Sequence, residues 1–230
     1  MPLRCFDIPS KGVSFSSGGK DSVLAMHLAS SEGIEIESIL TMLPDDPESM
    51  LYHTHNLAIV EKIAEAIDIP WITIRASKEG ELIALEEALS DLRVDYLISG
   101  GIESFFQKRK FDEACRKANL KHYAPLWHKS PQEVYRKLTS FEIDAIIVSV
   151  AAYGLEEDWL GSHLTEDTIA KLLHAAERYR FNAVGEGGDL DTLVLDAPLF
   201  KKRLIPISAT KIWEGDRGRL EIHSVESVAK

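Results

Sequence analysis

Ser16-Ser17-Gly18-Gly19-Lys20-Asp21-Ser22 is the stretch from which the architecture of this chain is predicted. The residues before it, Gly12-Val13-Ser14-Phe15, are short and apolar enough for a buried strand. After it, Leu24 and Leu28 lie one helical turn apart, so a helix is expected to follow. Adjacent glycines let an anion approach the backbone, and the first N–H groups of a helix lie unpaired at the positive end of its dipole. The stretch therefore predicts a strand, a tight turn and a helix that together form an anion site.

Two common phosphate-binding patterns do not fit this stretch. The pattern G-x-x-x-x-G-K-[ST] would need glycine at position 14 and serine or threonine at position 21, where the chain has Ser14 and Asp21. The dinucleotide pattern G-x-G-x-x-G is also absent here. The residues instead resemble the PP-loop, S-G-G-x-D-S, of the ATP pyrophosphatase superfamily, whose members cleave ATP between the α and β phosphates. The alternative is a connecting turn without function, which the flanking strand and helix disfavour.

The first half of the chain alternates between strand-like and helix-like segments. Strands are expected at 35–42, 71–74, 94–99 and 121–124, and helices at 52–67, 81–92 and 104–119 with Ser104 as N-cap. Such alternation implies a parallel sheet covered on both faces, with ligands at the carboxyl ends of its strands. The loop at Ser17-Gly18-Gly19, the segment after Met42 and the pair Gly100-Gly101 all lie at such ends, so they are expected to share one crevice.

The second half is less regular. Helices are expected at 131–141 and 165–180, and short strands at 144–150, 192–196, 204–207 and 220–223. The alternation breaks near residue 125. We therefore predict an α/β protein with a PP-loop ATP-binding domain at 1–125, of the Rossmann-like, adenine nucleotide alpha hydrolase-like type. A smaller α+β domain for substrate binding is predicted at 126–230.

Composition excludes several classes of protein. The 230 residues contain no apolar run long enough to cross a membrane. Cys5 and Cys115 are too isolated for a disulfide framework or a metal spacing, so a reducing cytoplasm is the expected compartment. The formal net charge of −11 disfavours unspecific binding to nucleic acid.

Three side chains near the loop have both a functional and an ordinary interpretation. Lys20 would bind phosphate and stabilise charge on departing pyrophosphate, or it is a solvated lysine at a helix start. Asp21 would hold Mg²⁺, which takes one or two carboxylates plus phosphate oxygens, or it is a first-turn acid favoured by the helix dipole. His53 would line the nucleotide crevice, or it is a surface or capping histidine. Its neighbour His55 lies two positions away and does not share a helical face with it, which disfavours a metal pair.

The remaining candidates lie further along the chain. Gln107 and Arg109 would meet a phosphate or an acidic partner, or they belong to a solvated basic face. The segment Gly185–Thr192 holds Glu186, Asp189 and Asp191 beside a predicted strand, which suits a cation, an amine or Mg²⁺; the alternative is an acidic surface turn. Trp127 and Trp159 are either platforms for a substrate or packing aromatics.

Six separated stretches together resemble the diphthine–ammonia ligase (diphthamide synthase) family of PP-loop enzymes. They lie at 16–22, 50–54, 100–109, 125–127, 149–161 and 185–200. The resemblance covers nearly the whole chain, and the pairing of the loop with the segment 185–200 is its most specific part. One departure is the run Asp189-Leu190-Asp191-Thr192, where the family has Glu-aromatic-Glu-Thr, so the geometry of this segment is in doubt.

The resemblance implies an ATP-dependent amidation of diphthine on elongation factor 2 to diphthamide, using ammonium and an acyl-adenylate and releasing AMP and pyrophosphate. It implies ATP and Mg²⁺ as cofactors, elongation factor 2, ATP and ammonium as partners, and neither nucleic acid nor membrane; the choice between a monomer and a homodimer is left open. The catalytic residues implied are Lys20, Asp21 and Glu186, with Asp21 also the Mg²⁺ ligand. The implied nucleotide-binding residues are Ser16, Ser17, Gly18, Gly19, Lys20, Asp21, Ser22, Met42, His53, Gly100 and Gly101. The implied residues for the diphthine-bearing substrate are Gln107, Arg109, Trp127, Glu186, Asp189, Asp191 and Thr192.

Three rival functions share the loop. A PP-loop enzyme that modifies tRNA is disfavoured by the net charge and, for sulfur transfer, by the lack of paired cysteines. A sulfonucleotide reductase needs a reactive cysteine near the C-terminus, and none follows Cys115. A protein that binds ATP or AMP without turnover is the rival from outside the enzymes.

Overall fold

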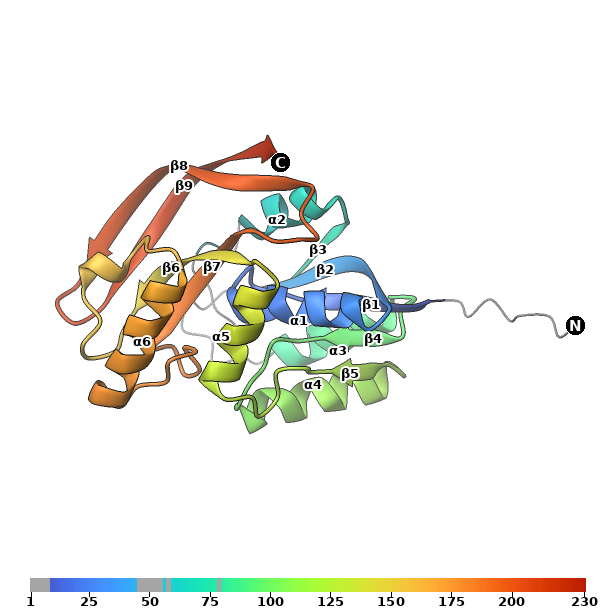
Figure 1. The fold of residues 1–230 in the computed structure, drawn as a ribbon. Helices are drawn as coiled ribbons and strands as arrows, with labels where there is room; N and C mark the ends of the chain where they lie inside the picture. Colours follow the sequence, from blue (N-terminus) through green and yellow to red (C-terminus); the bar gives the residue numbers. More distant parts are fainter. Residues whose placement is uncertain (1–8, 45–55, 57–58, 78–79) are drawn as a thin grey trace, which may run out of the picture.

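The computed structural model describes residues 9–44, 56, 59–77 and 80–230, which form two sheets with helices around them. Figure 1 shows the first sheet on the right, on the side of the N-terminus, and the second on the left, where the long hairpin of the last two strands forms part of it. The first sheet has five strands in the order β3-β2-β1-β4-β5, and the second has four in the order β7-β6-β9-β8. The residues that carry the candidate chemistry lie between them.

The five-stranded sheet is parallel throughout, which confirms the predicted α/β class. Its strand order reverses between β1 and β4, and loops from two adjacent strand ends diverge at such a point to leave a crevice. Its strands are β1 Ser10–Phe15, β2 Ile34–Pro44, β3 Trp71–Ala76, β4 Tyr96–Ile98 and β5 Lys121–Tyr123.

Helices cover both faces of this sheet because consecutive strand residues point to opposite sides. Val13, Leu40 and Leu97 share one buried cluster with Leu85, Leu89 and Phe111. Their neighbours Ile39 and Ile98 belong to the clusters on the other face. The helices are α1 Lys20–Ser31 and α2 Val60–Ile67 on one side, and α3 Glu81–Ser90 and α4 Phe105–Lys117 on the other.

The second half builds the antiparallel sheet and joins the core of the first. Its elements are α5 Pro131–Ser140, β6 Asp144–Val150, the 3₁₀ turn η2 Glu157–Trp159, α6 Glu166–Tyr179, β7 Leu190–Asp196, β8 Lys202–Trp213 and β9 Gly218–Ala229. One buried cluster contains Val23 and Ile63 from the first half together with Val148 and Leu193 from the second. The two halves therefore share apolar core, and the domain division near residue 125 stays a prediction.

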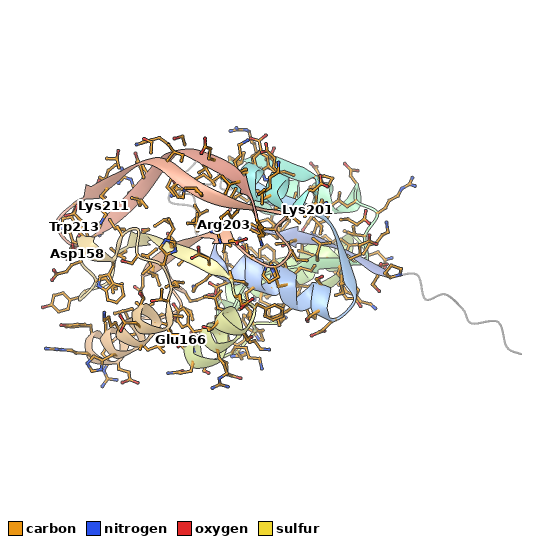
Figure 2. The ribbon with its side chains drawn as sticks, turned by 45° about the horizontal axis from the view of Figure 1, so that its top comes forward. Asp158, Glu166, Lys201, Arg203, Lys211 and Trp213 are labelled. Atoms are coloured by element: carbon orange, nitrogen blue, oxygen red, sulfur yellow. The ribbon has the colours of Figure 1, made fainter. Side chains whose placement is uncertain are left out.

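The strands β8 and β9 are longer than the short strands expected at 204–207 and 220–223. Most of their residues are exposed or half-buried, so they lack the apolar alternation that reveals a strand. They form an antiparallel hairpin in which Lys202 pairs with Ala229 and Trp213 with Gly218. Figure 2 shows Lys211 and Trp213 at the end of this hairpin that is remote from Lys201.

The expected helix from residue 52 is wrong where it crosses Asn56. Asn56 has a φ of 60°, in the left-handed region, and α2 begins only at Val60. Its side-chain amide donates to Leu220 O at 2.9 Å and its side-chain oxygen accepts from Ile222 N at 3.0 Å. Tertiary hydrogen bonds to β9 thus override the apolar periodicity. Among the described helices, none has the length and apolar character that a bilayer-spanning segment requires.

Candidate functional site

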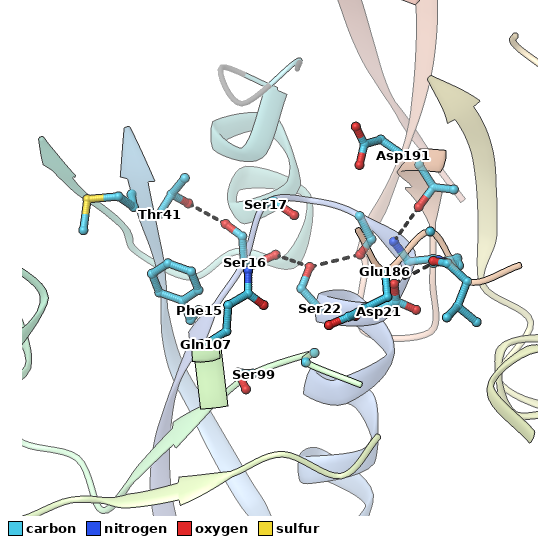
Figure 3. A pocket seen from close by; sticks show the side chains of 18 of the residues that line it. Phe15, Ser16, Ser17, Asp21, Ser22, Thr41, Ser99, Gln107, Glu186 and Asp191 are labelled. Carbon is cyan, nitrogen blue, oxygen red and sulfur yellow. Dashed lines mark hydrogen bonds and ion pairs between the residues drawn. The ribbon is translucent and has the colours of Figure 1, made fainter. Parts of the chain in front are cut away.

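A pocket opens at the carboxyl ends of β1 and β4, where the strand order reverses (Figure 3). It encloses about 930 Å³ of space, counting its open mouth. It is the region in which the sequence analysis expected three loops to meet. The lining residues are Phe15, Ser16, Ser17, Gly19, Lys20, Asp21, Ser22, Thr41, Met42, Ser99, Gly100, Gly101, Gln107, Phe111, Val184, Gly185, Glu186, Leu190, Asp191 and Thr192.

The glycine loop after β1 is held against a strand of the second half. Gly18 has a φ of 80°, which favours glycine, and its carbonyl accepts from Val194 N at 2.9 Å. Lys20 N, at the start of α1, donates to Thr192 Oγ1 at 3.0 Å. The turn that would receive an anion therefore takes its shape from β7 as well as from its own glycines. Gly18 itself lies outside the pocket lining, against Val60, Ile63 and Leu193.

Serine and threonine hydroxyls fix the same turn from within. Ser16 Oγ accepts from Gly18 N at 3.0 Å and lies 2.9 Å from Ser22 Oγ, which also donates to Gly19 O. Thr41 Oγ1 on β2 donates to Ser16 O at 2.9 Å. These contacts preorganise the loop, and a direct contact of Ser16, Ser17 or Ser22 with phosphate stays a prediction.

Gly100 brings the loop after β4 into contact with the first turn of α1. A Cβ built on Gly100 would lie 2.5 Å from the carbonyl carbon of Asp21 and 2.6 Å from Ser22 N, closer than real Cβ contacts. At Gly101 a Cβ would meet nothing within 4 Å. Only a glycine at position 100 allows the two loops to approach this closely, so it shapes the pocket by packing.

The side chain of Lys20 is buried and joins the loop to the second half. Its ammonium group is 2.6 Å from Val184 O and 2.9 Å from Asp21 Oδ2, and the side chain is 2% exposed. The neighbouring carbonyl, Ala183 O, accepts from the Tyr135 hydroxyl at 2.7 Å. Lys20 therefore positions the segment that leads to Glu186, and its expected contact with phosphate stays a prediction.

Asp21 presents the feature that a magnesium ion needs. Its Oδ2 accepts from Lys20, while its Oδ1 is buried at the pocket without a hydrogen-bond partner. The described residues contain no cluster of three or more histidine, cysteine, aspartate or glutamate side chains. A single carboxylate fits Mg²⁺, which keeps several waters and takes its other ligands from substrate phosphates.

The carboxylates of the segment Gly185–Thr192 lie in different surroundings. Glu186 Oε1 accepts from Ser104 N at 2.8 Å, so this carboxylate lies at the positive end of the α4 dipole and faces the pocket. Asp189 does not line the pocket; its Oδ2 accepts from Asn182 N at 2.9 Å and stabilises the turn. Asp191 and Thr192 line the pocket, and Thr192 lies beside Gly19 of the glycine loop.

Three further candidates from the sequence, Arg109, Trp127 and Trp159, are not among the described residues that line the pocket. Arg109 is exposed on α4. Trp127 is half-buried, with its ring 5.1 Å from that of Phe105 and 4.7 Å from that of His128. His53 lies outside the described residues. Trp159 packs against the main core.

One polar group in the pocket, and the hydrogen bonds behind it, were not predicted from the sequence. Ser99 lines the pocket, and its Oγ is 2.7 Å from His122 Nε2. His122 Nδ1 is 2.7 Å from Asp112 Oδ1. A small polar residue at a strand end, directly before Gly100, was a signal for Ser99. The partners were not predictable because the contact requires the pairing of β4 with β5 and the position of α4.

The pocket combines an anion-binding turn at a helix N-terminus, one carboxylate oxygen without a partner, and acidic groups contributed by the second half. Such a site suits a polyphosphate whose reacting phosphorus faces a second substrate.

Two family models match the chain, one for each half. The model described as the diphthamide synthase N-terminal domain matches residues 10–122, and the diphthamide synthase C-terminal domain matches residues 130–228. The chain is similar to curated proteins called diphthine–ammonia ligase. The protein from Rattus norvegicus is 31% identical over 93% of this chain and 85% of its own length. That from Danio rerio is 31% identical over 86% of this chain and 87% of its own length, and that from Saccharomyces cerevisiae is 23% identical over 92% and 37%.

Proposed function

Because the chain belongs to the diphthamide synthase family, we propose that it is an ATP-dependent ligase that converts the carboxylate of diphthine on elongation factor 2 into the amide of diphthamide. Ammonium supplies the nitrogen, an acyl-adenylate is the intermediate, and AMP and pyrophosphate are the products. The observation that carries this proposal is that the pocket unites both matched regions, with Lys20 N bonded to Thr192 Oγ1.

The loop after β1 is the binding element for the triphosphate. Its backbone N–H groups and the start of α1 attract the phosphates, and the preorganised turn needs little rearrangement when charge develops on the departing pyrophosphate. Asp21 Oδ1 is the atom that would hold Mg²⁺, which when bound offsets phosphate charge. Gly101 lines the pocket and carries no side chain, which leaves room there for the α-phosphate.

The carboxylate of diphthine attacks the α-phosphorus in this pocket, and ammonia then displaces AMP from the resulting anhydride. A carboxylate is a poor acyl donor until its oxygen becomes part of a good leaving group, which is why ATP is consumed. Glu186 and Asp191 place negative charge on the wall contributed by the second half. This suits the positive trimethylammonium group of diphthine.

Aromatic side chains near the start of α4 offer a second contact for that group. Phe105 is 69% exposed, and its ring lies 5.1 Å from Trp127 and 5.4 Å from His128. Quaternary ammonium groups bind over aromatic faces. We expect Trp127→Ala to raise the KM for elongation factor 2 and leave that for ATP unchanged; an equal change in both would contradict this role.

The net charge of −11 disfavours nucleic acid as the partner, and we place the protein in the cytoplasm together with its proposed protein substrate.

The test is direct. Elongation factor 2 carrying diphthine is incubated with the protein, ATP, Mg²⁺ and ammonium, and the modified peptide is analysed by mass spectrometry while the nucleotide products are separated. Conversion of the carboxylic acid to the amide with formation of AMP and pyrophosphate supports the proposal. ADP and orthophosphate, or amide formation without ATP, would refute it. Nucleotide binding without any product would favour a non-catalytic nucleotide-binding protein, and modification of added tRNA would favour the tRNA-modifying enzyme.

A further inference from the structure

Four side chains form a continuous hydrogen-bonded chain that begins at the pocket. Ser99 Oγ, just beyond β4, is 2.7 Å from His122 Nε2 on β5. His122 Nδ1 is 2.7 Å from Asp112 Oδ1 on α4, and Asp112 Oδ2 accepts from Lys108 Nζ at 2.7 Å. The His122 side chain is only 4% exposed, so Ser99 is its contact with the pocket.

The positions of the hydrogens in this series of hydrogen bonds follow from the Asp112 carboxylate at one end of it. An ionised carboxylate only accepts, so Nδ1 of His122 carries the hydrogen and Nε2 accepts from the Ser99 hydroxyl. Burial lowers the pKa of His122 below its usual value, outweighing the opposite effect of Asp112, while Lys108 lowers it further. Burial raises the pKa of Asp112, but the hydrogen bonds from Lys108 and His122 outweigh this, and the net shift is downward. At neutral pH the arrangement is a hydroxyl joined to a neutral imidazole and an ionised carboxylate.

The described residues that line the pocket include no imidazole and no thiol of their own. Their ionisable side chains are Lys20, Asp21, Glu186 and Asp191. Lys20 and Asp21 are paired with each other, and Glu186 accepts from the backbone of α4. The Ser99 hydroxyl is thus the route from this pocket to a neutral base of the kind that catalyses proton transfer near pH 7.

We propose that Ser99, His122 and Asp112 form a proton relay that removes a proton from the ammonium substrate in the pocket; this inference rests on the proposed function. The ammonium ion gives a proton to Ser99 Oγ as the Ser99 hydroxyl proton passes to His122 Nε2. The neutral ammonia then attacks the acyl carbon of the adenylate, the new C–N bond forms, and the C–O bond to AMP breaks with its electron pair. The proton lost as the amide forms leaves with the phosphate of AMP, and the imidazolium is held by Asp112 until it releases its proton to water.

Two variants interrupt the relay in different ways. Ser99→Ala removes the hydroxyl. Asp112→Asn keeps the shape, but Lys108 directs the amide oxygen toward itself and the amide NH₂ toward His122, so the imidazole takes the other tautomer and Nε2 can no longer accept. The control is His163→Gln, which breaks a histidine–aspartate contact of similar length, 2.6 Å to Asp144, among residues that do not line this pocket.

The two half-reactions separate this inference from the proposed function. With elongation factor 2 carrying diphthine, both variants should retain substrate-dependent ATP–pyrophosphate exchange, because adenylation needs no proton from ammonium. Their rate of amide formation with ammonium should fall about 10²- to 10⁴-fold, the usual contribution of a general base. His163→Gln should match the wild type in both assays. Failure of the wild-type protein to catalyse the exchange would refute the proposed function itself.

Hydroxylamine distinguishes a proton relay from a purely structural role of these residues, because a structural defect would slow the reactions with ammonium and with hydroxylamine alike. It is a strong nucleophile and largely unprotonated at neutral pH, so it needs no base before it attacks. Both variants should form the hydroxamate at close to the wild-type rate, with thermal unfolding curves similar to that of the wild type. Wild-type amide formation by Ser99→Ala, or equal losses with ammonium and hydroxylamine, would overturn the relay. Ser99→Ala removes only one oxygen atom, so it decides the question even if Asp112→Asn folds poorly.

Discussion

Replacing Gly100 with alanine tests the claim that backbone contact between two loops shapes the nucleotide pocket. The added Cβ would lie 2.5 Å from Asp21 C, 2.6 Å from Ser22 N and 2.7 Å from Asp21 O. All three atoms belong to the backbone of the first turn of α1, so no flexible side chain can move to relieve the overlap. An ordinary contact begins at about 3.4 Å. The loop after β4 and the start of α1 must therefore separate by close to an ångström.

The magnitude follows from this displacement. Overpacking of a tightly packed site costs about 1–3 kcal/mol of unfolding free energy. A melting temperature falls by roughly 2–4 °C for each kcal/mol in a protein of this size. A shift of about 1 Å in a reacting group can cost on the order of 10²-fold in rate. Gly100→Ala should therefore melt several degrees lower and release pyrophosphate about a hundred times more slowly with its protein substrate.

Gly101→Ala is the matched control for stability. Its Cβ would meet no atom within 4 Å, and its φ is not in the left-handed region. The change should leave the melting temperature unchanged or raise it slightly, because alanine restricts the unfolded chain by about 0.4–1 kcal/mol. Calorimetric melting of both variants measures the difference. If Gly100→Ala melts at or above the temperature of Gly101→Ala, the two loops are not in the contact described and the reasoning fails.

Three other changes test separate features of the site and core. Thr192→Val removes the acceptor for Lys20 N, so it should lower the free energy of unfolding by about 0.5–1.5 kcal/mol and weaken ATP binding. Thr192→Ser keeps the hydroxyl and should do neither. Urea unfolding and ATP titration compare the two variants, and equal behaviour would contradict a supporting role for this hydrogen bond. Asp21→Asn should raise the Mg²⁺ concentration needed for half-maximal pyrophosphate release, and an unchanged requirement would remove Asp21 as the ligand. Burial lowers the pKa of His27 below 6.5, so on acidification the unfolded chain binds a proton at this residue before the folded protein does. The free energy of unfolding should therefore fall as the pH drops below 6.5. The slope of this free energy against pH should be smaller in His27→Gln. Urea unfolding between neutral and mildly acidic pH measures this slope, and an identical slope in both proteins would count against a buried neutral imidazole.

Local chemistry explains why many of the helices and strands were predictable. Helix starts such as Ser104 before α4 and Ser130-Pro131 before α5 carry their own caps: Ser104 Oγ accepts from Gln107 N, and Ser130 with Glu133 forms a capping box. Strands buried on both faces are near-continuous apolar runs, so they are recognisable without their neighbours. The crevice followed from the rule that ligands bind at the carboxyl ends of parallel strands.

Features that depend on distant partners could not be predicted. The hairpin β8–β9 is held by pairing between strands whose side chains are mostly exposed, so no burial pattern marks its length. Asn56 leaves the helical conformation to bond β9 at Leu220 and Ile222. The burial of Lys20 was also not expected, because only the folded chain brings Val184 O within 2.6 Å of its ammonium group. Charged residues at a helix start usually lie in solvent, but tertiary contacts bury the side chain of Lys20.

The contact between Lys20 N and Thr192 Oγ1 joins residues that are 172 positions apart in the chain. During synthesis on the ribosome, the glycine turn is made first, and its β7 support is made only 172 residues later. A nascent chain cannot close this pocket around a nucleotide until then. ATP in the cell can therefore stabilise the finished protein, but it cannot guide the first steps of folding.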